Sequence, residues 1–232
     1  ILLSGAFAQK SSDIVLAKTT LIEQAEELGL NRDEITNYLV SDHYMSDYSK
    51  ATHLYLWQTY QGVPVYNGLF TIGIKNDKIY NLQTSAVKNL QDLIVTDQHS
   101  LSPEQAIKSA AEQLGYPNNE PFTRIDSDRA NSYVYAPTSF ASNNIPVYLC
   151  YDRAEDGTYV KSWNVDLDIP GSDYMSVRVD ANTGEIVSKN NYTVYCAFDM
   201  DLSHSHTASC KSAFAKNAKA VTTKTNEALV NT

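Results

Sequence analysis

The residues best suited to bind a metal lie near the C-terminal end of the sequence. His204, His206 and Cys210 fall within the stretch HSHTASC, and imidazole and thiolate groups are good zinc ligands. They supply only three ligands, in a weakly periodic segment rich in Ser, Thr, Lys and Asn. A solvated linker explains the same residues, so we expect no resident metal site in this chain.

Other chemistry is hard to find in the sequence. It contains no Gly-x-Ser-x-Gly elbow, no phosphate-binding glycine loop and no His-Glu-x-x-His motif. Asp and Glu are scattered, and no pair could be assigned the roles of acid and base. His43 and His53 are expected to be structural. We predict a non-catalytic chain without a cofactor; a metalloenzyme that uses the tail histidines is the enzymatic alternative.

Charge and hydropathy argue against nucleic-acid-binding and membrane proteins. The 18 basic and 27 acidic residues give a net charge of −9, which argues against a general binder of nucleic acid or anionic membranes. No apolar run approaches the roughly 20 residues that a membrane-spanning helix needs. A hydrophobic content of 43% in 232 residues is typical of one or two globular domains.

The N-terminus indicates export. The stretch ILLSGAFAQ resembles the end of a secretory signal peptide, with residues 1–8 as the remnant and cleavage after Ala8; a short buried strand is the other interpretation. A secreted protein meets conditions that permit disulfides. Cys196 and Cys210 could pair and leave Cys150 as a buried thiol, although spacing alone does not decide the pairing. Asn191-Tyr192-Thr193 matches a glycosylation acceptor, relevant to a eukaryotic source.

The first half reads as a helix followed by an antiparallel meander. Apolar residues recur with helical spacing between residues 12 and 29, and strands are predicted near 51–60, 64–75 and 79–87. Gln58 has the parity of its leucine neighbours, Leu54 and Leu56. Its amide is therefore predicted to be buried and to need hydrogen-bond partners.

The second half repeats this order. Ser102, Pro103 and Gln105 form the start of a capped helix that Gly115 ends. Strands are then predicted near 132–136, 146–152, 158–168, 174–180 and 185–189. The fold class is therefore α+β, with a helix packed on an antiparallel sheet in each of two modules and an irregular C-terminal tail.

The opening hairpin carries a family resemblance. Residues 40–44 (VSDHY), 52–58 (THLYLWQ) and 62–68 (GVPVYNG) resemble the fungalysin/thermolysin propeptide domain. The residues that carry this signature are His53, Gln58, Gly62, Pro64, Val65 and Asn67, and we interpret them as mainly structural.

The second half resembles a PepSY domain, the usual companion of that module. The matching stretches are LSPEQAIKSAAEQLG, KSWNVDLDI and VRVDANTGEIV, the last with Asp180, Thr183 and Gly184. The boundaries that follow are 9–88 for the first domain, 89–100 for a linker, 101–195 for the second domain and 196–232 for a connector.

The resemblance implies the propeptide of a secreted zinc metallopeptidase, which assists folding and inhibits its own catalytic domain. It also implies that both modules are cystatin-like. Zinc is then expected in the partner domain beyond the connector, where His204, His206 or Cys210 could reach it only in the complex. A free-standing secreted binding module is the alternative.

Overall fold

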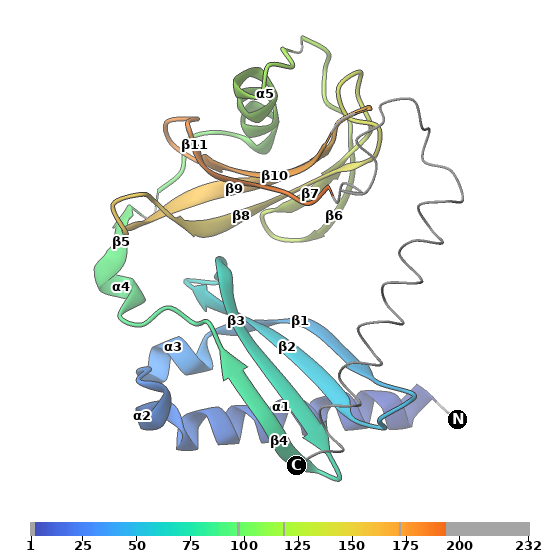
Figure 1. Ribbon diagram of the computed structural model, residues 1–232, viewed down its shortest axis with the longest axis vertical. Helices are drawn as coiled ribbons and strands as arrows, with labels where there is room; N and C mark the ends of the chain where they lie inside the picture. The colour runs from blue at the N-terminus through green and yellow to red at the C-terminus, as the bar shows by residue number, and fades with distance from the viewer. Residues whose placement is uncertain (1–2, 97, 118, 172, 194–232) are drawn as a thin grey trace, which may run out of the picture. The chain divides into compact units, whose positions relative to one another are not determined.

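Strands dominate the structure and few helices accompany them, which confirms the predicted α+β class. The structure is a computed structural model, and it describes residues 3–193 except 97, 118 and 172 (Figure 1). The predictions for the connector 196–232, for a Cys196–Cys210 disulfide and for His204 and His206 therefore lie outside the described residues.

The predicted N-terminal helix is present but interrupted. It consists of α1 (Leu3–Glu23) and α2 (Ala25–Leu28), and a third helix, α3 (Arg32–Thr36), follows. Gly29 ends α2 with a φ of 66°, a left-handed conformation in which glycine is favoured. None of the helices in the described part of the chain is long and apolar enough to span a bilayer.

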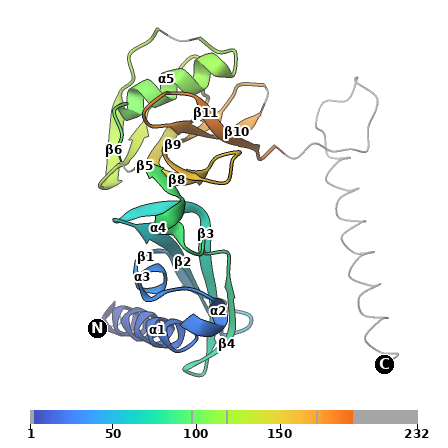
Figure 2. The same ribbon diagram turned by 90° about the vertical axis from the view of Figure 1, so that its left-hand side faces the viewer.

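The first sheet is an antiparallel meander covered by α1 on one face (Figures 1 and 2). Its order is β1 (Tyr38–Met45), β2 (Thr52–Tyr60), β3 (Val63–Lys75) and β4 (Lys78–Thr84). The three predicted strands are confirmed as β2 to β4, whereas β1 was not predicted. A bulge between Val40 and Asp42 interrupts the alternation of apolar and polar residues from which a strand is predicted.

The predicted linker is not free of regular structure. It contains α4 (Leu90–Leu93) and β5 (Ile94–Thr96), and β5 pairs in parallel with β9 of the second half. Elements this short form because of tertiary pairing, so local sequence gives little sign of them.

The second half is an antiparallel sheet with α5 (Pro103–Gln113) against one face (Figure 1). The predicted capping box is confirmed: the Gln105 N–H donates to Ser102 Oγ, and the Ser102 N–H donates to Gln105 Oε1. The strands follow the predictions except for β6, which was missed: β6 (Arg124–Arg129), β7 (Ser132–Tyr135), β8 (Ile145–Arg153), β9 (Tyr159–Asp168), β10 (Tyr174–Asp180) and β11 (Ile186–Asn191).

The buried apolar residues form two clusters, and β3 contributes to both: Phe70 lies in one, and Val63 and Val65 lie in the other. One cluster of buried apolar residues includes Leu21 and Phe70, and a second includes Ile107 and Trp163. We expected two separate sheets. Instead β3 continues into β8 through the parallel pair Val65 and Tyr151, so the strands form one mixed sheet of order β1-β2-β3-β8-β9-β10-β11.

Candidate interaction surfaces

Gln58 is completely buried, as its position among the leucines predicted. Its side-chain amide pairs with both backbone groups of Val87: Nε2 donates to Val87 O at 2.9 Å, and Oε1 accepts from Val87 N at 2.8 Å. A Cβ on Gly68 would lie 3.0 Å from Gln58 Oε1, so a larger residue at this position would crowd the buried amide. Gln58 thereby fixes the chain at Val87, just after β4, where it leaves the first module.

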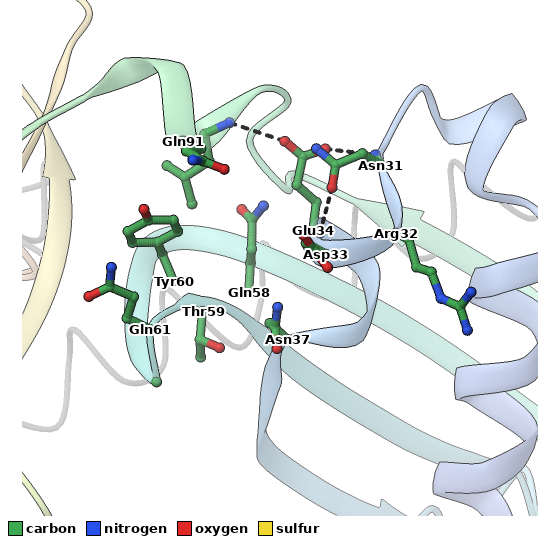
Figure 3. Close-up of a pocket in the computed structure, with 12 residues that line it drawn as sticks. Asn31, Arg32, Asp33, Glu34, Asn37, Gln58, Thr59, Tyr60, Gln61 and Gln91 are labelled. Atoms are coloured by element: carbon green, nitrogen blue, oxygen red, sulfur yellow. Dashed lines mark hydrogen bonds between the residues drawn. The ribbon is translucent and has the colours of Figure 1, made fainter.

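Glu34 holds a neighbouring residue of the same segment, Leu90, and lines the pocket in Figure 3. It is 7% exposed, and its two carboxylate oxygens accept the N–H groups of Asn31 at 2.8 Å and Leu90 at 3.1 Å. We did not predict this role, although Asn31 three residues before Glu34 is the signal of a capping box. Between these groups lies a pocket of about 550 Å³ whose lining includes Asn37, Gln58 and Gln91.

The other residues of the propeptide signature build the β2–β3 hairpin. Gln61 and Gly62 both have left-handed φ values, 50° and 78°, the conformation of a two-residue hairpin turn. Pro64 is the second residue of β3, and Asn67 is left-handed with a φ of 60°. Val65 is 1% exposed and forms the pair that joins β3 to β8.

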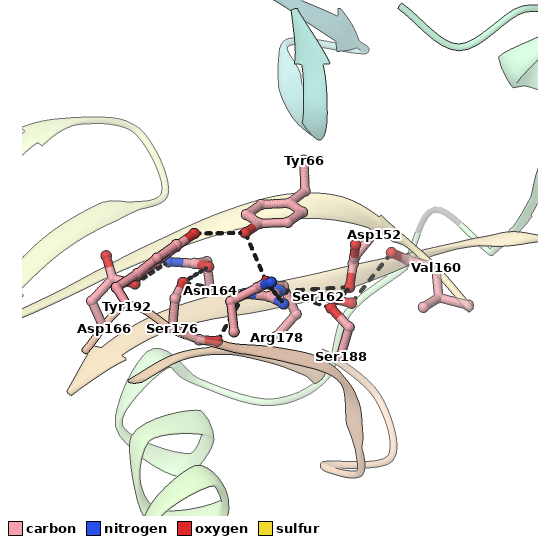
Figure 4. A network of polar contacts seen from close by, with 11 residues as sticks. Tyr66, Asp152, Val160, Ser162, Asn164, Asp166, Ser176, Arg178, Ser188 and Tyr192 are labelled. Carbon is pink, nitrogen blue, oxygen red and sulfur yellow. Dashed lines mark hydrogen bonds and ion pairs between the residues drawn. The ribbon is translucent and has the colours of Figure 1, made fainter. Parts of the chain in front are cut away.

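A buried arginine organises the face of the second sheet that lies away from α5 (Figure 4). Arg178 is 1% exposed. Its guanidinium donates to Ser188 Oγ at 2.8 Å, Ser176 O at 2.8 Å and Asn190 Oδ1 at 2.6 Å. The carboxylate of Asp152 lies 3.6 Å from Arg178 Nε and accepts from Ser188 Oγ. The charge is therefore both paired and hydrogen-bonded, which burial demands.

Tyr66 connects this network to the first module. It belongs to β3, and its ring covers Arg178 with the guanidinium carbon 4.2 Å from the ring centroid. Its hydroxyl lies 3.1 Å from Asn190 Oδ1 and 3.1 Å from the Tyr192 hydroxyl. Burial, followed by the hydrogen bond with Tyr192, raises the pKa of Tyr66. The hydroxyl therefore stays protonated and available as a donor at neutral pH.

The β10–β11 turn, which contains Asp180, Thr183 and Gly184, forms hydrogen bonds with α5. Asp180 Oδ1 accepts the N–H groups of Asn182 and Thr183, at 2.7 and 2.9 Å. Gly184 has a φ of 82°. Its carbonyl accepts hydrogen bonds from Ser109 Oγ and Gln113 Nε2 of α5.

The face of the first sheet that lies away from α1 carries aromatic side chains. We call Tyr44, His53, Tyr55 and Tyr80 the aromatic face. Tyr44 stacks on His53 with centroids 5.2 Å apart and on Tyr55 at 6.3 Å. Opposite His53 is Gly73, where a Cβ would lie 2.6 Å from the Tyr80 ring. Tyr44 is 46% and Tyr80 58% exposed, so this face presents aromatic surface to solvent.

We expected Cys150 to be a buried thiol and His43 to be structural. Cys150 is a free, buried cysteine, and burial raises the pKa of its thiol. His43 Nε2 lies 2.8 Å from the carboxylate of Asp13 in α1. Across the part of the chain that the structure describes, no three His, Cys, Asp or Glu residues gather closely enough to hold a metal ion.

The hairpin, the buried amide and the left-handed turn all fall within one recognisable segment. Residues 38–86, which run from the start of β1 to just past β4, match the family described as Fungalysin/Thermolysin Propeptide Motif. The family match therefore covers the first sheet, including Gln58, Gly62 and the aromatic face.

Extracellular metalloproteinases are among the curated relatives of this chain. Extracellular metalloproteinase 1 of Arthroderma gypseum is 30% identical over 171 residues, which are 69% of this chain and 27% of the relative. Extracellular metalloproteinase mep of Aspergillus terreus is 30% identical over 158 residues, 66% of this chain and 25% of the relative. The matched part of the chain thus spans about a quarter of these proteins.

One solved structure, the Bacillus megaterium YpeB C-terminal domain, is similar at a TM-score of 0.37 and 11% identity. The similarity covers 79% of this chain and 66% of that chain.

Proposed function

We propose that this chain is the propeptide of a secreted metalloproteinase, and that it assists folding of the linked catalytic domain and inhibits it. The observation that carries the proposal is the propeptide motif at residues 38–86 in a chain that matches about a quarter of extracellular metalloproteinases. The catalytic zinc then belongs to the partner domain, and this chain is non-catalytic.

The domain organisation that we propose follows the two cores. Residues 9–88 form the propeptide domain and 101–195 a PepSY-like domain, both cystatin-like, with the remnant of a signal peptide at residues 1–8. Residues 196–232 connect them to the catalytic domain. Covalent linkage makes the inhibitory contact intramolecular, so a modest interface suffices at the high effective concentration.

The aromatic face is the surface that we assign to the catalytic domain. Exposed aromatic side chains are enriched at protein interfaces, because they bury a large area with little loss of conformational freedom. Tyr44 and Tyr55 are held by stacking, and a hydrogen bond with Tyr44 raises the pKa of Tyr55. A pre-ordered surface of this kind loses little entropy when it binds.

Titration of residues 9–232 into the mature peptidase of the same precursor tests the proposal. We expect saturable loss of peptide cleavage near one-to-one stoichiometry. A parallel expression of the precursor with and without residues 9–192 measures the folding role as the yield of active enzyme. Full activity at every propeptide concentration, together with an unchanged yield, would contradict the proposal and favour a free-standing binding module.

A further inference from the structure

A glycosylation acceptor stands at the end of the last described strand. Asn191-Tyr192-Thr193 is the only Asn-x-Ser/Thr sequence in the 232 residues, and Asn191 is the final residue of β11. Such acceptors are used where they lie on the surface of a protein that enters the secretory pathway. The asparagine is exposed in the folded chain.

Strand alternation separates this asparagine from the polar network beside it. Asn190 accepts hydrogen bonds from Arg178 and Tyr66, and the Tyr192 hydroxyl lies 3.1 Å from the Tyr66 hydroxyl. Asn191, opposite Met175 of β10, has the other parity. A substituent on Asn191 therefore projects from the opposite face of the sheet and leaves the contacts of Arg178 and Tyr66 in place.

We propose that Asn191 carries an N-linked glycan. In the reaction, Asn191 Nδ2 forms a bond to the anomeric carbon of an oligosaccharide linked to a lipid diphosphate. The bond between that carbon and the diphosphate oxygen breaks, the lipid diphosphate leaves with the electron pair, and the amide nitrogen loses one proton. The step needs no oxidant or reductant, and the hydroxyl of Thr193 completes the acceptor sequence.

The position of the glycan gives it a structural consequence. Among the described strands β11 pairs only with β10, so it forms an edge of the sheet. Open edges of this kind invite pairing with another chain. A bulky, hydrated glycan at Asn191 shields the end of this edge and directs the catalytic domain to other surfaces. The inference rests on secretion, which is part of the proposed function.

The test is expression of the whole precursor behind a secretion leader of a yeast host, followed by treatment of the secreted protein with peptide-N-glycosidase. We expect a gel shift in the propeptide and conversion of residue 191 to Asp in its peptide mass spectrum. Asn191→Gln and Thr193→Ala should abolish both signals, whereas Thr193→Ser should keep them. Pro121→Thr provides the positive control, since it places an acceptor at the exposed Asn119.

Glycan on the Pro121→Thr variant at Asn119 alone, with Asn191 unmodified in every protein, would overturn the proposal. The leader delivers the chain to the secretory pathway whatever its own N-terminus does. Failure of this test is therefore distinct from failure of the propeptide role, which the inhibition assay measures separately.

Discussion

Two buried polar side chains show how single residues hold this fold. Gln58 satisfies both backbone groups of Val87, and Arg178 is paired with Asp152 and hydrogen-bonded to its neighbours. In each case the cost of burying the polar group is offset only because every strong donor or acceptor has a partner. Removing one partner should therefore destabilise the protein more than an average substitution.

Gln58→Ala should lower the free energy of unfolding by about 2–4 kcal/mol, because it leaves the N–H and C=O of Val87 unpaired and opens a cavity. Urea denaturation followed by circular dichroism measures the change. Gln83→Ala is the matched control on the exposed side of β4, and we expect it to stay within about 0.5 kcal/mol of wild type. Equal effects of the two variants would contradict the structural role of Gln58.

Arg178→Met should destabilise by about 3–5 kcal/mol, because the carboxylate of Asp152 then stays buried without its counter-charge. The double variant Arg178→Met/Asp152→Asn should recover part of this loss, since no unpaired charge remains. Lys189→Met, an exposed change in the neighbouring strand β11, is the control. The same denaturation experiment compares the four proteins, and absence of any recovery would show that the charge pair is unimportant.

At the scale of elements, α5 is seated by polar contacts at both ends. Ser109 and Gln113 donate to the Gly184 carbonyl of the β10–β11 turn. At its N-terminal turn, Glu104 accepts a hydrogen bond from the Tyr135 hydroxyl of β7 at 2.6 Å. Burial raises the pKa of Glu104, but this hydrogen bond and smaller favourable contacts outweigh burial, so the pKa lies below its ordinary value of 4.5.

This contact predicts an acid-sensitive attachment of α5. Because the folded-state pKa of Glu104 is depressed, its contribution to stability is present above the unfolded value of 4.5 and is lost as pH falls through the folded pKa. Tyr135→Phe should reduce stability by about 1 kcal/mol at neutral pH and flatten the fall in stability between about pH 5 and pH 3. The free energy of unfolding is measured for both proteins at several pH values. An equally steep fall in both proteins would contradict the role of the Tyr135–Glu104 hydrogen bond.

In the described chain as a whole, β3 contributes buried residues to both hydrophobic clusters. Val65 pairs with Tyr151, and the next residue, Tyr66, covers Arg178. The same strand also forms part of the sheet whose outer side is the aromatic face. The segment that matches the propeptide motif thus supplies both the joint to the second sheet and the surface that we assign to the catalytic domain.

The double variant Tyr44→Ala/Tyr55→Ala should weaken inhibition of the mature peptidase at least about tenfold, which corresponds to about 1.4 kcal/mol of binding free energy. Tyr48→Ala is the control, because Tyr48 is fully exposed in the loop after β1. The inhibition constant of each variant is the measurement, with its unfolding curve as the check on folding. Unchanged inhibition by the double variant would exclude the aromatic face from the interface.

Features that depend on near neighbours in the chain could be predicted from the sequence. The capped helix at Ser102, the hairpin around Gly62 and the burial of Gln58 all follow from spacing, turn chemistry and parity within a few residues.

Features that join distant segments of the chain could not be predicted in this way, because they depend on the folded arrangement. The short strand β5 exists through its pairing with β9, Glu34 binds a backbone group 56 residues away, and the Tyr66 ring covers a buried arginine of another strand. None of these features is stable without its contacts, since an unpaired short strand or an isolated buried charge costs free energy. Their positions are therefore set by the contacts that the complete fold supplies.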